Sequence, residues 1–170
     1  MKRMLAALGL AVGLAVVSVA AQETVKVDLK DLKGAEVGTA TLKAAAGGGV
    51  SIALDVKNLA PGDHAFHIHQ AAKCEPPFAT AGPHFNPEAK QHGLQNPDGA
   101  HAGDMNNITV GADGTAKVTI VNKQVTLGAG PNSVFANGGT ALVIHAKADD
   151  MKTDPAGNAG DRIACGVVAK

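Results

Sequence analysis

The stretch VSIALDVK, residues 50–57, alternates strictly between apolar side chains and polar or small ones. In an extended chain, successive side chains point to opposite sides. One face would then carry Val50, Ile52, Leu54 and Val56. This two-residue period is typical of a strand with one buried and one exposed face, so we predict a β-strand whose apolar face packs on a core.

Seven further segments have the length and pattern of strands, and they are separated by turn signals such as APGD and GADG. They are TVKVDLK (24–30), AEVGTATLK (35–43), HAFHIH (64–69), MNNITV (105–110), GTAKVTIV (114–121), TALVIHA (140–146) and RIACGVV (162–168). No segment after residue 21 has a convincing helical period. Many short strands with glycine-rich turns favour an all-β fold, either an antiparallel sandwich or a flattened barrel.

The N-terminal residues have the layout of a secretory signal peptide. Lys2 and Arg3 precede the apolar run LAALGLAVGLAVVSVA, which ends in small residues. A permanent transmembrane anchor is the alternative, although the run is slightly short for one and lacks a charged stop. We expect a signal peptide at 1–21, a single domain at 22–170, and export to the periplasm or the extracellular space without stable membrane association.

Charge and cysteine content limit the partners and the compartment. Fifteen basic residues balance fifteen acidic ones, and loss of Lys2 and Arg3 would leave 13 against 15, a net charge of −2. This balance gives no indication of a nucleic-acid partner. In an exported chain the two cysteines, Cys74 and Cys165, most simply form one disulfide, and two buried free thiols are the alternative.

Histidine is concentrated in HAFHIHQ, residues 64–70, which holds three of the seven in the chain. Alternation places Phe66 and Ile68 on one face of this strand and His67 and His69 on the other. Any one histidine alone is more simply a surface or core residue with a satisfied hydrogen bond. Seven on one small domain favour a metal site, because neutral imidazole is the commonest metal ligand and suits zinc and copper.

Two connections, 71–104 and 146–162, are long, polar and rich in Gly, Pro and Asn. Connections of this length without regular structure are usually disordered or functional. The first carries four potential ligands, His84, His92, His101 and Asp104. Three imidazole nitrogens and one carboxylate oxygen would make a closed tetrahedral zinc site. His67 and His69 lie on a strand and would need a second ion, completed by His145.

Six segments resemble the successive metal and active-site segments of the copper-zinc superoxide dismutases. They are AFHIH, GPHFNP, QHG, HAGD, LVIHAKADD and GNAGDRIACGV. The resemblance runs from about residue 24 to 169. It implies an eight-stranded antiparallel Greek-key barrel or sandwich with two long functional loops. It also implies a superoxide dismutase, which converts superoxide to dioxygen and hydrogen peroxide by alternate reduction and oxidation of copper.

The resemblance implies one copper ion and one zinc ion per subunit, bridged by the imidazole of His84. The copper ligands would be His67, His69, His84 and His145. The zinc ligands would be His84, His92, His101 and Asp104. The chain carries a residue of the required type at each of these positions.

Five further positions match the family outside the ligands. Asp149 would bond one copper-side and one zinc-side histidine, and Arg162 would lie beside copper as a catalytic residue together with His84. Cys74 and Cys165 would form the family disulfide. His64 matches a structural histidine, so we assign it no metal.

The chain also departs from the family pattern, and an alternative function stays open. Ala146 stands where many members carry an acid, and the connection at 146–162 has few of the charges used to guide substrate. Substrate steering and subunit contacts, including a homodimer, are therefore not fixed by the resemblance. A non-enzymatic exported copper or zinc carrier would need the ligands but neither Arg162 nor Asp149. A cupredoxin is disfavoured because no cysteine accompanies the copper histidines, and a zinc hydrolase because no HExxH is present.

Overall fold

The computed structural model describes residues 23–170, so the expected signal peptide at 1–21 lies outside it. The strands are β1 (Thr24–Asp31), β2 (Glu36–Ala44), β3 (Val50–Val56), β4 (Gly62–His64), β5 (Phe66–His69), β6 (Ile108–Val110), β7 (Ala116–Asn122), β8 (Thr140–His145) and β9 (Arg162–Val168). Two short 3₁₀ turns, η1 (Ala79–Ala81) and η2 (Ala136–Gly138), are the only helical elements within residues 23–170. In this part of the chain no helix could cross a membrane. The all-β prediction is confirmed.

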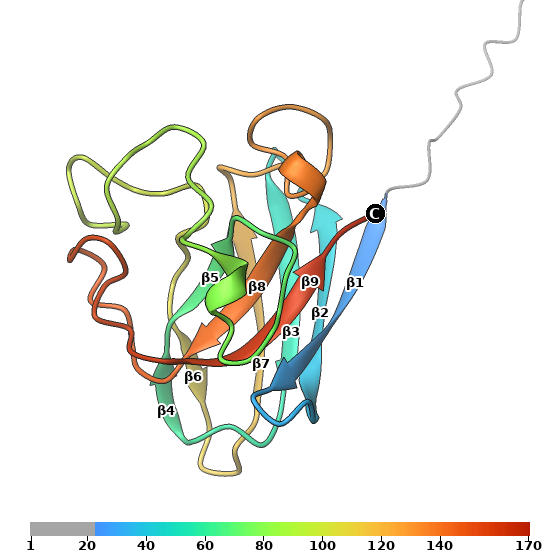
Figure 1. The fold of residues 1–170 in the computed structure, drawn as a ribbon, viewed down its shortest axis with the longest axis vertical. Helices are drawn as coiled ribbons and strands as arrows, with labels where there is room; N and C mark the ends of the chain where they lie inside the picture. The colour runs from blue at the N-terminus through green and yellow to red at the C-terminus, as the bar shows by residue number, and fades with distance from the viewer. Residues whose placement is uncertain (1–22) are drawn as a thin grey trace, which may run out of the picture.

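Seven strands form one antiparallel sheet in the order β5-β8-β9-β1-β2-β3-β7, and β4 pairs with β6 in a second, smaller sheet. The two edges of the large sheet are β5 and β7. In the sequence, β4 directly precedes the edge strand β5, and β6 directly precedes the edge strand β7. The small sheet therefore sits between the edges of the curled large sheet (Figure 1), as expected for a flattened barrel.

The strand expected at 64–69 is divided at Ala65, so nine strands are present in the described chain and not eight. On one side of this residue β4 pairs with β6, and on the other side β5 pairs with β8. Ala65 stays bonded to the end of β8, because its N–H donates to the carbonyl of Lys147 at 2.8 Å and its carbonyl accepts the N–H of His145 at 2.9 Å. The chain thus turns from one sheet to the other without leaving backbone groups unpaired.

The strand expected at 105–110 is shorter than predicted and begins only at Ile108. The residues before it are used for tertiary contacts. Met105 is 2% exposed and belongs to the hydrophobic core, whereas the Asn107 amide bonds to the backbone of Asp149. The segment leading into β6 therefore connects the core to the second long loop.

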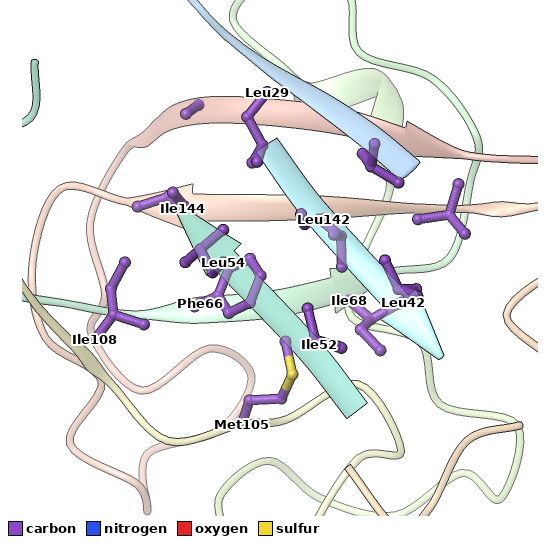
Figure 2. Packing of buried hydrophobic residues seen from close by; sticks show 14 of the residues in the cluster. Leu29, Leu42, Ile52, Leu54, Phe66, Ile68, Met105, Ile108, Leu142 and Ile144 are labelled. Carbon is purple, nitrogen blue, oxygen red and sulfur yellow. The ribbon is translucent and has the colours of Figure 1, made fainter. Parts of the chain in front are cut away.

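The hydrophobic core lies between the strands, with apolar side chains of opposite walls pointing toward one another (Figure 2). The face predicted for β3 is buried as expected: Val50, Ile52, Leu54 and Val56 are at most 1% exposed. Phe66 and Ile68 from β5 are fully buried in the same core. Burial of such side chains contributes about 1.5–3 kcal/mol each. The opposite face of β5 carries buried histidines instead of apolar residues.

The two long connections, 71–104 and 146–161, lie on the same side of the barrel (Figure 1). The first is tied to β5, since the N–H of Phe85 donates to the carbonyl of Ile68 at 2.8 Å. The two connections are also tied to each other, since the N–H of Gln95 donates to the carbonyl of Met151 at 3.0 Å. Together they cover the histidine face of β5.

The predicted disulfide is present between Cys74, near the start of the first connection, and Cys165 in β9. It closes a loop with a sequence separation of 91 residues. In the chain-entropy treatment a loop of this size contributes about 4–5 kcal/mol of stability. The bond fixes the first connection against the strand that begins with Arg162.

Candidate metal centre

Four histidines converge on the outer face of β5. His67 and His69 lie on that strand, and His145 ends β8, which pairs with β5. His84 comes from the first long connection. One ring nitrogen of each lies within 4.8 Å of those of the other three, and all four side chains are at most 4% exposed. The predicted copper-side residues are thus brought together.

The hydrogen bonds of His67 and His84 fix which ring nitrogen carries a proton. His67 Nε2 donates to Asp149 Oδ2 at 2.8 Å, and His84 Nδ1 donates to Asp104 Oδ1 at 2.9 Å. A neutral imidazole has one N–H and one lone pair. The second nitrogens, His67 Nδ1 and His84 Nε2, are therefore lone pairs, and both are buried without a hydrogen-bond partner.

His69 and His145 follow the same rule. His69 Nδ1 donates to the carbonyl of Gly82 at 2.8 Å, and His145 Nδ1 donates to the carbonyl of Gly160 at 3.2 Å. The remaining nitrogens, His69 Nε2 and His145 Nε2, are 3.3 Å apart and are both lone pairs. Buried polar atoms left without partners are costly. Four imidazole lone pairs directed into one dry space therefore fit a cation that prefers nitrogen ligands, such as copper.

A second group forms around the carboxylate of Asp104. Its Oδ1 atom lies 2.9 Å from His84 Nδ1, 3.0 Å from His92 Nδ1 and 3.3 Å from His101 Nδ1. All four side chains are buried. Three imidazole nitrogens and one carboxylate oxygen within one coordination sphere are the donor set of a structural zinc site. The predicted zinc-side residues are thus brought together, and His84 belongs to both groups.

Asp104 is held as an anion by its surroundings. Its second oxygen, Oδ2, accepts the backbone N–H groups of Gly93 at 2.9 Å and His101 at 3.0 Å. Burial by itself would raise the pKa of this carboxyl, but the hydrogen bonds from three histidines and from Gly93 outweigh it and hold the pKa well below its usual range. A permanently ionised carboxylate is what a divalent cation requires.

Asp149 links the two groups. Its Oδ2 accepts His67 Nε2 at 2.8 Å and its Oδ1 accepts His92 Nε2 at 3.0 Å, so one carboxylate bonds a histidine of each group. Burial opposes its charge, yet the bonds from these two rings keep its pKa below the ordinary value. Hydrogen bonds from ligand imidazoles to such carboxylates orient the rings and raise their basicity.

Comparison with known proteins identifies the family of the chain that carries these two groups. A family model described as copper/zinc superoxide dismutase (SODC) matches residues 36–168. The chain belongs to the copper/zinc superoxide dismutase family.

Relatives within this family are similar over most of the chain. The chain is 51% identical to superoxide dismutase [Cu-Zn] 1 of Aquifex aeolicus over 154 residues, covering 89% of this chain and 90% of that protein. It is 45% identical to an extracellular superoxide dismutase [Cu-Zn] of Brugia pahangi over 128 residues, covering 70% of this chain and 62% of that protein. The Cu/Zn superoxide dismutase of Brucella abortus has a similar solved structure, with a TM-score of 0.69 and 29% identity over 86% of this chain and 99% of that one. The predicted family and fold are confirmed.

The remaining histidine of the dismutase barrel, His64, lies in neither group. Its Nδ1 is 2.8 Å from the carbonyl oxygen of His145 and its Nε2 is 2.8 Å from the carbonyl oxygen of Ala60. Both ring nitrogens are thus used in backbone contacts. His64 therefore connects β4 to the end of β8 and has no nitrogen left for a metal.

Arg162 of this dismutase lies next to His69 and is anchored by the first connection. Its Nη1 donates to the carbonyl of Phe78 at 2.7 Å, and its Nη2 donates to the carbonyl of Gly82 at 2.8 Å. The Gly82 carbonyl is also the acceptor for His69 Nδ1, so guanidinium and copper-side ring share one oxygen atom. Arg162 is only half-buried and lines a cavity of about 540 Å³ with Leu32, Pro77, Ala79, Gly160 and Asp161.

Burial keeps three of the predicted copper-side histidines of this dismutase, His69, His84 and His145, neutral in the absence of metal. Burial, with smaller contributions from neighbouring histidines and from Arg162, lowers the pKa of His145 to about 3 and also lowers that of His69. Burial lowers the pKa of His84 to about 4, although its bond to Asp104 opposes the shift. His92 behaves differently, because its bonds to two carboxylates overcome burial and raise its pKa to about 9.

Two contributors to the dismutase centre were not foreseen in the sequence. The amide of Asn107 pairs with the backbone of Asp149, accepting its N–H at 2.8 Å and donating to its carbonyl at 2.9 Å. Gly157 approaches the Asp149–His92 hydrogen bond so closely that a Cβ atom would lie 2.8 Å from His92 Nε2. Asn107 stands before the short strand that follows HAGD, and Gly157 is the first glycine of GNAGD. Neither motif indicates which distant residue its member will contact.

Proposed function

We propose that the chain dismutates superoxide with copper held by His67, His69, His84 and His145, and zinc held by His84, His92, His101 and Asp104. The observation that carries this assignment is the position of His84. Its Nδ1 faces Asp104 and the zinc-side rings, and its Nε2 is an unpartnered lone pair on the copper side. One imidazole can therefore serve both groups.

The overall reaction takes two superoxide ions and two protons to one dioxygen and one hydrogen peroxide. A bound copper ion would supply the one-electron redox chemistry, and zinc would supply fixed positive charge. The protein residues hold the rings in place through Asp149 and through the carbonyls of Gly82 and Gly160. His84 Nε2 is the atom at which a proton could be held next to the substrate, while Nδ1 would stay on the zinc side beside Asp104 and keep the ring in place.

Arg162 is the residue proposed to bind the anion. A guanidinium stays charged at every working pH and offers several donors in a fixed plane. Two of its nitrogens bond loop carbonyls, which orients the group, and its half-buried position leaves it open to a cavity. The structural and the substrate-binding interpretation of this arginine are therefore compatible.

The carrier function is the weaker alternative. A metal carrier would need the seven proposed ligand residues, but it would have no use for a guanidinium anchored beside the copper-side rings. It would also have no use for a carboxylate that couples the two groups. The relatives identified by sequence are described as superoxide dismutases, which favours the enzyme.

We further propose that residues 1–21 direct export, so that the enzyme acts in the periplasm or outside the cell. One relative within the family is described as extracellular, which supports export. The disulfide supports the same conclusion, because such bonds persist in oxidising compartments.

The test is metal analysis combined with a superoxide-consumption assay on the parent and three alanine variants. His84→Ala should change both the copper spectrum and zinc retention. His69→Ala should alter copper alone, and His101→Ala should alter zinc alone, so these two serve as matched controls. A response of only one metal to His84→Ala would refute the shared ligand. Full metal content without superoxide consumption in the parent would favour the carrier.

A further inference from the structure

The three zinc-side histidines use their Nδ1 atoms on the Asp104 side, so each has a second nitrogen that points elsewhere. For His84 that nitrogen is the lone pair on the copper side, and for His92 it is the N–H that donates to Asp149 at 3.0 Å. For His101 it is Nε2, which lies 3.9 Å from Asp154 Oδ1. Asp154 is thus the outer neighbour of the third ring.

Asp154 contacts the zinc-side segment at a second point. Its Oδ1 accepts the backbone N–H of His92 at 2.6 Å, across a sequence separation of 62 residues. The same oxygen therefore faces both a ligand-bearing backbone and a ligand ring. The carboxylate is 50% exposed, whereas the His101 side chain is only 9% exposed. It covers the ring on the solvent side.

The tautomer of His101 decides whether the nitrogen facing Asp154 carries a proton. If Nδ1 is the metal-directed nitrogen, the proton must reside on Nε2. Nε2–H then points at an anionic acceptor. A separation of 3.9 Å is too long for a direct hydrogen bond, so Asp154 acts on the ring through its charge or through a bridging water. A carboxylate in this position raises the basicity of the metal-directed nitrogen.

We propose that Asp154 is a positioning residue of the zinc group, orienting His101 by its charge and holding the backbone of His92 by its hydrogen bond. The inference rests on the proposed zinc ligands and adds an outer carboxylate to them. Each zinc-side ring then has a defined partner for its second nitrogen: the copper side for His84, Asp149 for His92, and Asp154 for His101. The second long connection would contribute two carboxylates to the zinc group, Asp149 from near its start and Asp154 from its middle.

Asp150 provides a matched control in the same connection. Its carboxylate accepts only groups of its own loop, namely the N–H groups of Lys152 and Thr153, the Thr153 hydroxyl and the Asn158 amide. Asp150→Asn removes the same charge from the same exposed loop without touching a zinc-side residue. It therefore separates a local effect on His101 from a general loss of negative charge.

The experiment measures zinc affinity by chelator competition in the copper-free, zinc-loaded full chain. We expect Asp154→Ala to bind zinc about 10-fold more weakly or worse, within the 10- to 100-fold range for lost outer carboxylates. Asp154→Asn keeps an acceptor for the His92 N–H and loses the charge, so it should fall between the parent and Asp154→Ala. Asp150→Asn should equal the parent.

A spectroscopic readout separates positioning from a merely structural tie between loops. In protein labelled with ¹⁵N at histidine, Asp154→Asn should shift the Nε2–H signal of His101 and leave that of His92 in place. Zinc affinity within twofold of the parent in Asp154→Ala, or a His101 signal unmoved by Asp154→Asn, would overturn the inference.

The proposed ligands are tested separately by His101→Ala. If the parent binds no zinc, or if His101→Ala retains it, the zinc assignment itself fails. If His101→Ala loses zinc while both Asp154 variants match the parent, the ligands stand and only the role of Asp154 is refuted.

Discussion

Replacing Gly157 with alanine should damage the metal centre from a position that holds no ligand. Gly157 has a φ of +61°, and a Cβ atom there would collide with Asp149 Oδ1 and lie 2.8 Å from His92 Nε2. The left-handed backbone alone costs alanine roughly 1–2 kcal/mol. Displacing Asp149 from His92 would leave buried polar groups unpaired, at about 1–3 kcal/mol more.

The matched control is Gly34→Ala. Gly34 has a φ of +81°, and a Cβ atom there would meet nothing within 4 Å. Gly34→Ala should therefore lose stability only through the cost of the left-handed backbone conformation. Urea unfolding of the metal-free proteins should therefore show Gly157→Ala to be about 1–3 kcal/mol less stable than Gly34→Ala. Zinc affinity should fall about 10- to 100-fold in Gly157→Ala alone. Equal stability losses and unchanged zinc affinity in the two variants would refute the reasoning.

Three further predictions concern steering, the disulfide and pH. Arg162→Ala should keep both metals, lose most superoxide consumption, and show a flatter fall of rate with ionic strength, since charge guidance contributes about 10- to 1000-fold to on-rates and is screened by salt; parental rates across a salt series would contradict this. Replacing Cys74 and Cys165 together with serine should lower the free energy of unfolding by about 4–5 kcal/mol in urea titrations, and an unchanged midpoint would argue against it. The metal-free protein should lose stability as pH falls below 6.5, because burial lowers the pKa of His84 to about 4 and that of His145 to about 3, so the unfolded chain binds protons that the folded chain cannot. The expected slope is about 1.4 kcal/mol per pH unit for each such histidine, and identical urea midpoints at pH 6.5 and 5 would rule this out.

Strand periodicity predicted most of the fold because the burial of alternate residues is a local property. The face of Val50 in β3 and the opposite faces of Phe66 and His67 in β5 are as expected. The division at Ala65 could not be predicted in this way. Alternation continues through that residue, and only the choice of partner strands, which is set by the whole topology, ends one strand and begins the next.

The residues proposed as ligands could be singled out in the sequence because metal chemistry restricts both their type and their number, and the structure brings them together in two groups. The residues that support them could not, since their types are common in any loop. Asp154 and Gly157 contact the first connection, and Asn107 contacts Asp149, only when segments far apart in the sequence pack against each other. An asparagine before a strand or an aspartate before a proline has many ordinary explanations. Only the partner, far away in sequence, distinguishes the one that applies.

The place of β9 in the large sheet determines when, during synthesis, this sheet can finish forming. The last strand of the chain lies between β8 and β1, and so joins the pair β5-β8 to the group β1-β2-β3-β7. A nascent chain emerging from the ribosome can pair its early strands, and β4-β6 can link β5 to β7, but the large sheet stays divided between β8 and β1 until β9 is made. Arg162 and Cys165 arrive with that strand. Truncation by even a few residues at the C-terminus would therefore be far more harmful than a cut of equal length in a surface loop.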